Sequence, residues 1–62
     1  MIKLTTPNGP SIRTHYVSAE NISRITEAGA SSQWHGIKTI VRCFDGETLE
    51  VSEEAAWIVE RV

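Results

Sequence analysis

Three side chains in this sequence could bind a soft metal ion or act in nucleophilic catalysis: His15, His35 and Cys43. They lie far apart along the chain and lack the paired spacing of zinc-binding motifs. Cys43 also falls on the core side of its expected strand, where a cysteine usually acts as a small hydrophobic residue. A Cys–His nucleophile needs a partly exposed, electropositive setting and a third group that orients the base, and the sequence indicates neither. We therefore expect no metal site and no catalytic residue.

The glycines and the carboxylates give no stronger signal of catalysis. The four glycines stand in separate turns, so no glycine-rich loop is present that could hold a phosphate or a nucleotide cofactor. The glutamates between positions 47 and 54 are explained as a solvated rim and the start of a helix. One small domain rarely encloses a substrate, although a cleft between the subunits of a homo-oligomer remains an alternative. We expect a protein without a cofactor that is not an enzyme.

The length and the composition indicate a single domain that spans residues 1–62. A domain of 62 residues buries only about 60% of the surface that its unfolded chain exposes. Small domains therefore often depend on a disulfide, a metal or a partner subunit. Cys43 is the only cysteine, which excludes an intrachain disulfide.

Neither a membrane span nor a secretory signal is indicated by the sequence. The longest unbroken apolar run, residues 55–59, is far shorter than the roughly 20 residues that a transmembrane helix requires. Residues 1–6 lack the charged leader and apolar block of a signal peptide. We expect a cytoplasmic protein without a membrane partner.

The charge pattern disfavours a nucleic-acid partner. Eight acidic and six basic residues give a net charge of −2, and the basic residues are spread along the chain instead of forming the cluster that tracks phosphates. The alternative is a small-barrel nucleic-acid-binding protein, in which folding would bring Arg13, Lys38 and Arg42 to one face beside aromatic side chains.

The first expected element is a hairpin. Residues 2–5 alternate between apolar and polar, residues 7–10 carry the Pro and Asn-Gly signals of a turn, and residues 12–17 form the returning strand. Ile12 and Tyr16 share one face of that strand, and neither face is cleanly apolar. This pattern is typical of an edge strand or of a strand that leaves the sheet partway.

Residues 18–27 are ambiguous. Ser18 could cap a short helical turn, and Ile22 and Ile25 stand at helical spacing. The same residues could flank a bulge within a strand. We favour a turn that leads into a strand over residues 22–27.

Residues 37–51 form the hairpin whose register is best determined by the sequence. A two-residue turn at Asp45 and Gly46 would pair Val41 with a glutamate and mix the two faces. A three-residue loop, residues 44–46, with Gly46 in the left-handed conformation and a bulge, pairs Val41 with Leu49 instead. Because a slip of one residue turns every side chain to the opposite face, burial should select the second register, with the odd-numbered face in the core.

The C-terminal segment, residues 52–62, is expected to be a helix that packs on the sheet. Ser52 is a suitable N-cap and is followed by two glutamates that favour a helix N-terminus. The apolar residues at helical spacing form the expected inner stripe, and they are Ala55, Ile58, Val59 and Val62. The fold class is then mainly β with a C-terminal helix (α+β): a small bent antiparallel sheet or an SH3-like barrel of about five strands capped by one helix. A plain meander of four or five strands is the alternative.

Two tryptophans leave their roles open. Trp34 lies in the small, polar segment 28–36, where it either folds back over an open end of the barrel or anchors a partner, as tryptophans often do at interfaces. Trp57 has the same two interpretations, although its position is more typical of a residue at the edge of the core.

Three further large apolar residues fall on faces that we expect to lie outside the core: Tyr16, Ile40 and Phe44. Together with a tryptophan they would form an apolar patch, which on a small domain marks self-association or partner binding. We therefore expect the partner-binding residues to be Tyr16, Trp34, Ile40, Phe44 and Trp57. The expected function is a self-associating protein-interaction module, a homo-oligomer that is accessory to a larger assembly such as a flagellum or a phage-like particle.

The chain also resembles the FlbD family of very small flagellar-associated proteins over nearly its whole length. The resemblance rests on short segments: the opening Met1-Ile2-Lys3-Leu4-Thr5, Asn8-Gly9, Asn21-Ile22 with Ile25, the hairpin that turns at Asp45-Gly46, and Val51 followed by an acidic helix start and Val59-Glu60-Arg61-Val62. It departs from the family pattern in both tryptophans and in an inserted loop between residues 28 and 36. The resemblance implies a small cytoplasmic accessory protein linked to motility, with no catalytic residues to carry over.

Overall fold

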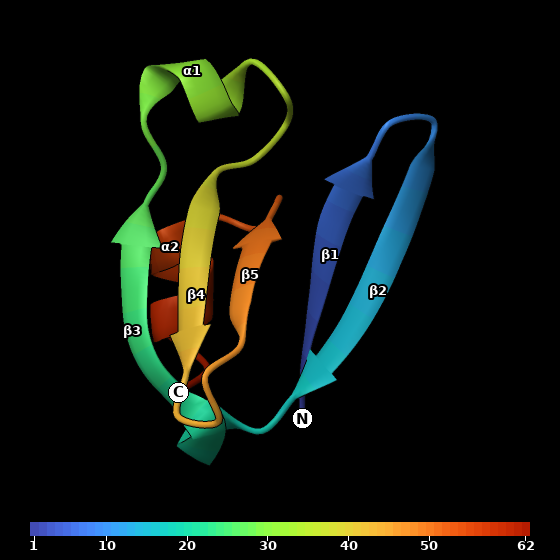
Figure 1. Ribbon diagram of the computed structural model, residues 1–62. Helices are drawn as coiled ribbons and strands as arrows, with labels where there is room; N and C mark the ends of the chain where they lie inside the picture. Colours follow the sequence, from blue (N-terminus) through green and yellow to red (C-terminus); the bar gives the residue numbers. More distant parts are fainter.

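The computed structural model describes residues 1–62 as five short strands and three short helical segments (Figure 1). The strands form two antiparallel sheets, one of β1 and β2 and one in the order β3-β4-β5. Their bounds are β1 (Ile2–Asn8), β2 (Ser11–Val17), η1 (Ala19–Asn21), β3 (Ile22–Glu27), α1 (Ala30–Gln33), β4 (Thr39–Cys43), β5 (Thr48–Val51) and α2 (Ala55–Val59). The expected mainly β fold is confirmed. The SH3-like barrel capped by a helix stays a prediction.

The hairpin of β1 and β2 is confirmed and is longer than expected. Its register runs from Ile2 opposite Val17 to Asn8 opposite Ser11 without a shift. The two central residues of the turn are Gly9, with φ +61°, and a proline whose ring fixes a negative φ. Positive φ at the first central position is the requirement of a type II′ turn, which suits the twist of a hairpin. β2 pairs with β1 alone, so it is the edge strand that its mixed faces predict.

The favoured interpretation of residues 18–27 is confirmed. A single 3₁₀ turn, η1, leads directly into β3. The Ser18 side chain makes no capping hydrogen bond, so the turn forms without a cap. A bulge, as in the alternative interpretation, also occurs in this strand, because the register between β3 and β4 shifts between Ile22 and Arg24.

The hairpin of β4 and β5 has the register that burial was expected to select. Val41 is opposite Leu49 and Thr39 is opposite Val51. The loop is closed by hydrogen bonds from Gly46 N–H to the Cys43 carbonyl (3.1 Å) and from Cys43 N–H to the Glu47 carbonyl (2.9 Å). Gly46 has φ +96°, a conformation that a residue with a Cβ rarely adopts.

Residues 28–36 contain a helical turn, α1, which the sequence did not indicate. The loop is closed by hydrogen bonds from Ala28 N–H to the Lys38 carbonyl (3.0 Å) and from Ile37 N–H to the Ser32 carbonyl (3.2 Å). Gly36 has φ +82°, and a Cβ placed on it would lie 3.7 Å from the ring of Pro7. The segment is thus held by hydrogen bonds at both ends, and at Gly36 it lies close to Pro7 of the first hairpin.

The predicted helix over residues 52–62 is wrong in its length and in its inner stripe. α2 covers only Ala55–Val59, and Glu54, not Ser52, precedes it as the N-cap. Ser52 instead continues from β5 and donates its N–H to the Thr5 carbonyl at 2.8 Å. Of the four residues in the expected stripe, Ile58 alone is fully buried, whereas Val59 and Val62 are exposed. Pairing with β1 therefore takes up the first turn of the expected helix.

Both sheets contribute to one core. Its buried cluster takes two residues from β1, one from β2, two from β4, one from β5 and one from α2, and its members are Ile2, Leu4, Val17, Val41, Cys43, Val51 and Ile58. α2 lies behind the sheet of β3, β4 and β5 in Figure 1. The buried Thr39 hydroxyl donates to the Glu53 carbonyl at 2.6 Å, so its polar group is satisfied. No helix in the structure is long and apolar enough to cross a membrane.

Candidate interaction surface

The five residues expected to bind a partner lie on separate elements. Tyr16 is in β2 and is 64% exposed, and Phe44, directly after β4, is 73% exposed. Ile40, in β4, is half-buried. The two tryptophans lie at the end of α1 and within α2.

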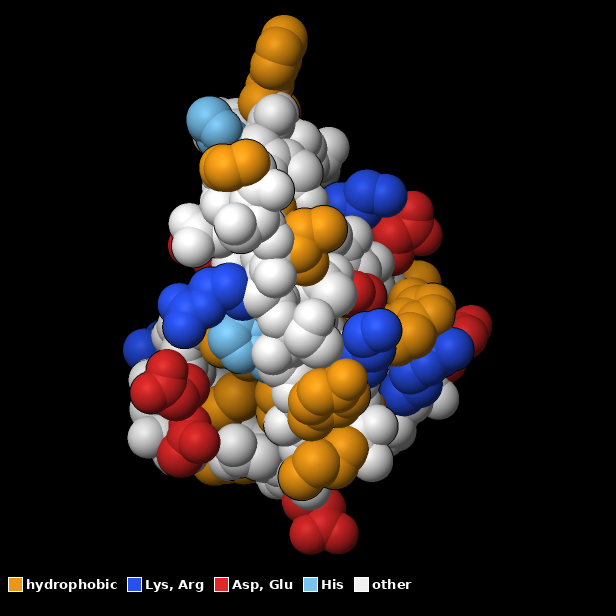
Figure 2. All heavy atoms as spheres, turned by 90° about the vertical axis from the view of Figure 1, so that its right-hand side faces the viewer, with side chains coloured by type: hydrophobic (Ala, Val, Ile, Leu, Met, Phe, Trp, Pro, Cys, Tyr) orange, Lys and Arg blue, Asp and Glu red, His pale blue; other side chains and the backbone are white.

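The structure does not gather these residues into one apolar patch. The loop that carries α1 and the turn between β4 and β5 lie at opposite ends of the molecule in Figure 1, so Trp34 and Phe44 are on opposite ends. Figure 2 shows hydrophobic side chains in separate groups, with charged side chains between them. Scattered exposed apolar residues are normal on a protein surface. A contact surface must therefore be argued from fewer residues than the sequence suggested.

Trp34 is the most exposed of the five, with 89% of its surface accessible. The interpretation in which it folds back over an open end of the sheet is wrong. Its backbone is fixed nonetheless, because Trp34 N–H donates to the Ala30 carbonyl at 3.3 Å. Figure 2 shows one hydrophobic side chain projecting from the end that α1 occupies in Figure 1.

Trp57 is a residue at the edge of the core. It is half-buried and packs against the core cluster. The Arg61 guanidinium lies 3.6 Å from the centroid of its ring and donates to the Trp57 carbonyl at 2.9 Å. One face of this indole is therefore covered within the chain.

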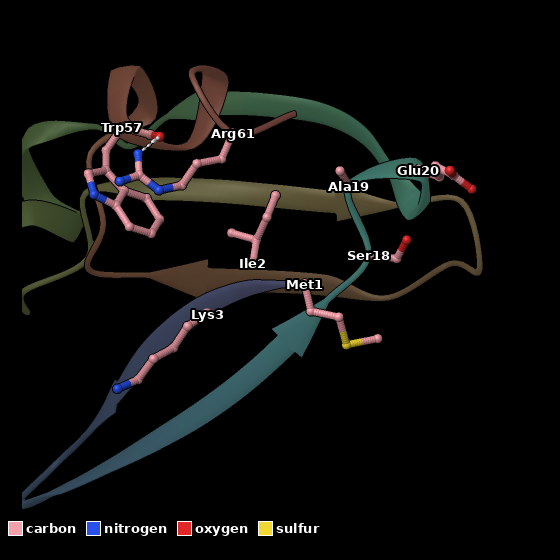
Figure 3. Close-up of a pocket in the computed structure, with 8 residues that line it drawn as sticks. All are labelled: Met1, Ile2, Lys3, Ser18, Ala19, Glu20, Trp57 and Arg61. Atoms are coloured by element: carbon pink, nitrogen blue, oxygen red, sulfur yellow. Dashed lines mark hydrogen bonds between the residues drawn. The ribbon is translucent and has the colours of Figure 1, made fainter.

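Trp57 and Arg61 form one wall of an open hollow of about 590 Å³ between β1, η1 and α2. Figure 3 shows the Arg61 side chain beside the Trp57 ring, with Lys3, Met1 and Glu20 at separate points around the hollow. The charged groups of both signs do not converge on one point. This arrangement gives no single recognition centre for a small ligand.

The outer face of β2 carries an apolar strip that the sequence analysis only half identified. Ile12 and Tyr16 stand on the same face of the strand, because side chains two and four apart share a face. Ile12 is 71% exposed. The alternation along residues 12–17 placed it beside Tyr16, so the signal that would have added Ile12 to the candidate site was present in the sequence.

The backbone of β2 also has a free edge at these residues. Thr5 lies opposite Thr14 in the ladder, yet both backbone groups of Thr5 are engaged on its other side. Its carbonyl accepts from Ser52 N–H, and its N–H donates to Glu53 Oε1 at 2.8 Å. Thr5 and Thr14 are therefore a non-hydrogen-bonded pair of the ladder.

Hydrogen-bonded and non-hydrogen-bonded pairs alternate along an antiparallel ladder. The pairs of Ile12 with Pro7 and of Tyr16 with Lys3 are then also non-hydrogen-bonded, which suits a proline because it has no N–H. The N–H and carbonyl groups of Ile12, Thr14 and Tyr16 therefore point away from β1, toward solvent. Ile12 and Tyr16, which form the apolar strip, are thus two of the three residues whose backbone groups are unpaired.

The turn that carries Phe44 is held by several hydrogen bonds. Phe44 N–H donates to the Asn21 carbonyl at 2.7 Å, and the Asp45 carboxylate accepts from Glu47 N–H at 2.9 Å and from Asn21 Nδ2 at 3.1 Å. The backbone bond from Glu47 and then the Asn21 bond lower the pKa of Asp45 below its ordinary value of 3.8. The turn therefore holds Phe44 outward in a defined position.

Cys43 behaves as the core residue that the hairpin pattern predicts. It is buried and unpaired. Burial first, and then the negative charges of Asp45 and Glu47, raise its pKa above 9.0. Cys43 and His15 line one open hollow, whereas His35 lies in the loop after α1. No group of three potential ligands is close enough to hold a metal ion.

The basic residues of the nucleic-acid alternative are on different parts of the molecule. Arg13 lies on β2, whereas Arg42 lies on β4 opposite Arg24 of β3. Lys38 lies 3.7 Å from a carboxylate oxygen of Glu54. The structure thus places these three cations in three different settings.

No family model, no curated protein and no solved structure matches this chain.

Proposed function

We propose that this protein is a non-enzymatic interaction module that self-associates and serves as an accessory to a larger assembly. One observation carries the proposal: the exposed apolar strip of Ile12 and Tyr16 lies on an edge strand whose backbone groups at the same residues have no partner. An unpaired strand edge is a ready template for another strand. Covering large apolar side chains at the same time adds the hydrophobic contribution that drives association.

Two other features support an interaction role. Trp34 and Phe44 are large, exposed and attached to backbone that is fixed by hydrogen bonds, which is how aromatic anchors are presented to a partner. The resemblance to the FlbD family supports an accessory role in motility, and the SH3-like arrangement of the strands is part of the same proposal. In this view the chain contributes surfaces and no chemistry.

Molar mass measured by light scattering over a range of protein concentrations tests self-association. We expect a mass that rises toward that of a dimer with concentration and changes little with salt, because the contact is apolar and backbone-mediated. Tyr16→Lys should reduce the mass to that of the monomer, and Phe44→Glu shows whether the turn contributes. Thr48→Lys is the matched control, since Thr48 is polar and exposed on β5. A wild-type monomer at every concentration would contradict the proposal.

A further inference from the structure

We infer that the partner of β2 is β2 of a second copy of this chain, paired antiparallel across a two-fold axis with Thr14 opposite Thr14. The inference rests on the proposed function, self-association, and specifies the surface and the register. Because the two strands are related by a two-fold axis, the same residues serve both copies and the pairing closes at a dimer.

β2 is the unprotected edge of this fold. Natural edge strands are blunted by bulges, by internal proline, by charge or by a covering element. Among the other edge strands, β3 has a register shift and packs against α2. β1 and β5 lie against each other, and the free edge of β1 is bonded to Ser52 and Glu53 at Thr5. β2 extends over seven residues, its register has no shift, and no proline occurs in it. Arg13 is its only arginine, lysine or acidic residue.

The phase of the ladder selects the register. Only Ile12, Thr14 and Tyr16 direct their N–H and carbonyl groups to the free edge, as Thr5 establishes. With Thr14 opposite Thr14, Ile12 of each copy meets Tyr16 of the other, and all three outward residues are paired. A slip of two residues in either direction leaves one of the three without a partner.

The side chains select the same register. It places each Ile12 against the second copy's Tyr16 on the outer face, and a β-branched residue beside an aromatic one is a stabilising cross-strand pair. The slip that sets Ile12 opposite Thr14 would bring Arg13 against Arg13 of the second copy, where like charges destabilise the pair. In the inferred register Arg13 instead faces His15 of the second copy, so the two Arg13 side chains are not opposed.

The size of the contact predicts a weak dimer. Two seven-residue strands and two apolar pairs bury less than the ~1,600 Å² of a standard stable interface. We therefore expect dissociation in the micromolar-to-millimolar range, and a dimer that forms at high local concentration. This strength suits an accessory protein that is gathered by a larger assembly.

Amide hydrogen exchange of the wild-type protein at pH 8, measured at low and high concentration, tests the register. Exchange at Ile12, Thr14 and Tyr16 should slow by roughly tenfold once most of the protein is dimeric. Exchange at Arg13 and His15 should not change, because their N–H groups already bond to β1.

A cysteine at position 14 gives a second, independent measurement. Thr14→Cys should form a disulfide-linked dimer on mild oxidation, since opposed residues of a hydrogen-bonded pair have Cα atoms about 5.5 Å apart. Ser11→Cys on the same strand is the matched control, because its two copies would be on the order of 20 Å apart.

The outcomes separate this inference from the proposed function. A dimer by light scattering in which exchange at Ile12, Thr14 and Tyr16 is independent of concentration would overturn the β2 pairing and leave self-association standing. Equal cross-linking of Thr14→Cys and Ser11→Cys would also overturn the register. A monomer at every concentration would overturn both proposals.

Discussion

At the scale of single residues, the hydrogen bonds that a side chain makes determine its structural role more than its residue type does. Asp45 is exposed, like most acidic residues of this chain, yet its carboxylate accepts hydrogen bonds from Glu47 N–H and Asn21 Nδ2. The first bond lies within the β4–β5 turn, and the second joins this turn to the residue that precedes β3. The carboxylate thus links two segments that are distant in the sequence.

The lowered pKa of Asp45 predicts a pH dependence of stability. A carboxylate whose pKa is lower in the folded state stabilises the protein above its unfolded pKa, and this stability is lost as the pH falls through the folded value. Stability should therefore decline below pH 3.8. Asp45→Asn, which retains an acceptor oxygen, should decline less over this range. Chemical unfolding followed from about pH 5 to about pH 2 measures both slopes.

Glu60→Gln is the control for net charge, because Glu60 is exposed and its carboxylate makes no recorded hydrogen bond. If Asp45→Asn and Glu60→Gln flatten the pH dependence equally, the hydrogen bonds at Asp45 are not its cause.

Sequence reasoning worked for residues whose faces follow from strand alternation and failed for those placed by the loop. Val41, Cys43 and Val51 are buried, as the odd-numbered face predicted. Trp34 is exposed at the end of α1, a helical turn that the small polar segment did not signal. The residues around Trp34 show no apolar periodicity from which the orientation of its side chain could be inferred.

At the scale of elements, two glycines of the chain offer a matched pair of tests. Gly46 has φ +96° and Gly29 has an ordinary φ, and a Cβ on either would meet no atom within 4 Å. Gly46→Ala should destabilise the fold by roughly 1 kcal/mol or more, purely through the backbone. Gly29→Ala should be neutral or stabilising by about 0.4–1 kcal/mol, because it restricts the unfolded chain.

Urea denaturation of the two glycine variants gives the comparison directly. Equal stability of Gly46→Ala and the wild type would show that the loop does not need its left-handed residue. The three-residue loop and its register would then need another explanation.

The two hairpins and the C-terminal helix show where local sequence is sufficient. The hairpin registers follow from turn residues and alternation, which are local. The start of α2 depends on Ser52 pairing with Thr5, a partner at the other end of the chain. Capping preferences correctly rank Ser52 as an N-cap, but a strand contact outcompetes them. No local sequence pattern indicates the contact between Ser52 and Thr5.

At the scale of the whole molecule, one side chain joins the two sheets. Glu53 accepts from Thr5 N–H at 2.8 Å and from Thr5 Oγ1 at 2.7 Å, and its own carbonyl accepts from Thr39. A carboxylate thereby completes the edge of β1 where no strand continues. The odd-numbered core face of β4 and β5 could be predicted, whereas this junction could not, because a glutamate after a strand gives no indication of its acceptor role.

Glu53→Ala should lower the free energy of unfolding by about 1.5–3 kcal/mol, the usual contribution of hydrogen bonds to a charged group. Glu53→Gln should lose less, because its amide oxygen still accepts from Thr5 N–H. Both variants keep the backbone carbonyl that binds Thr39. Denaturant midpoints of the two variants measure both losses of stability. Equal losses would show that the negative charge of Glu53, and not its acceptor oxygen alone, stabilises the fold.

The burial of Cys43 determines how this chain responds to its chemical surroundings. Cys43 is 5% exposed and its pKa is raised above 9.0, so both its accessibility and its fraction of reactive thiolate are low. An oxidant or an alkylating reagent should therefore modify Cys43 slowly, and faster when the β4–β5 hairpin opens. A partner that holds this hairpin closed should lower the rate at which Cys43 is modified.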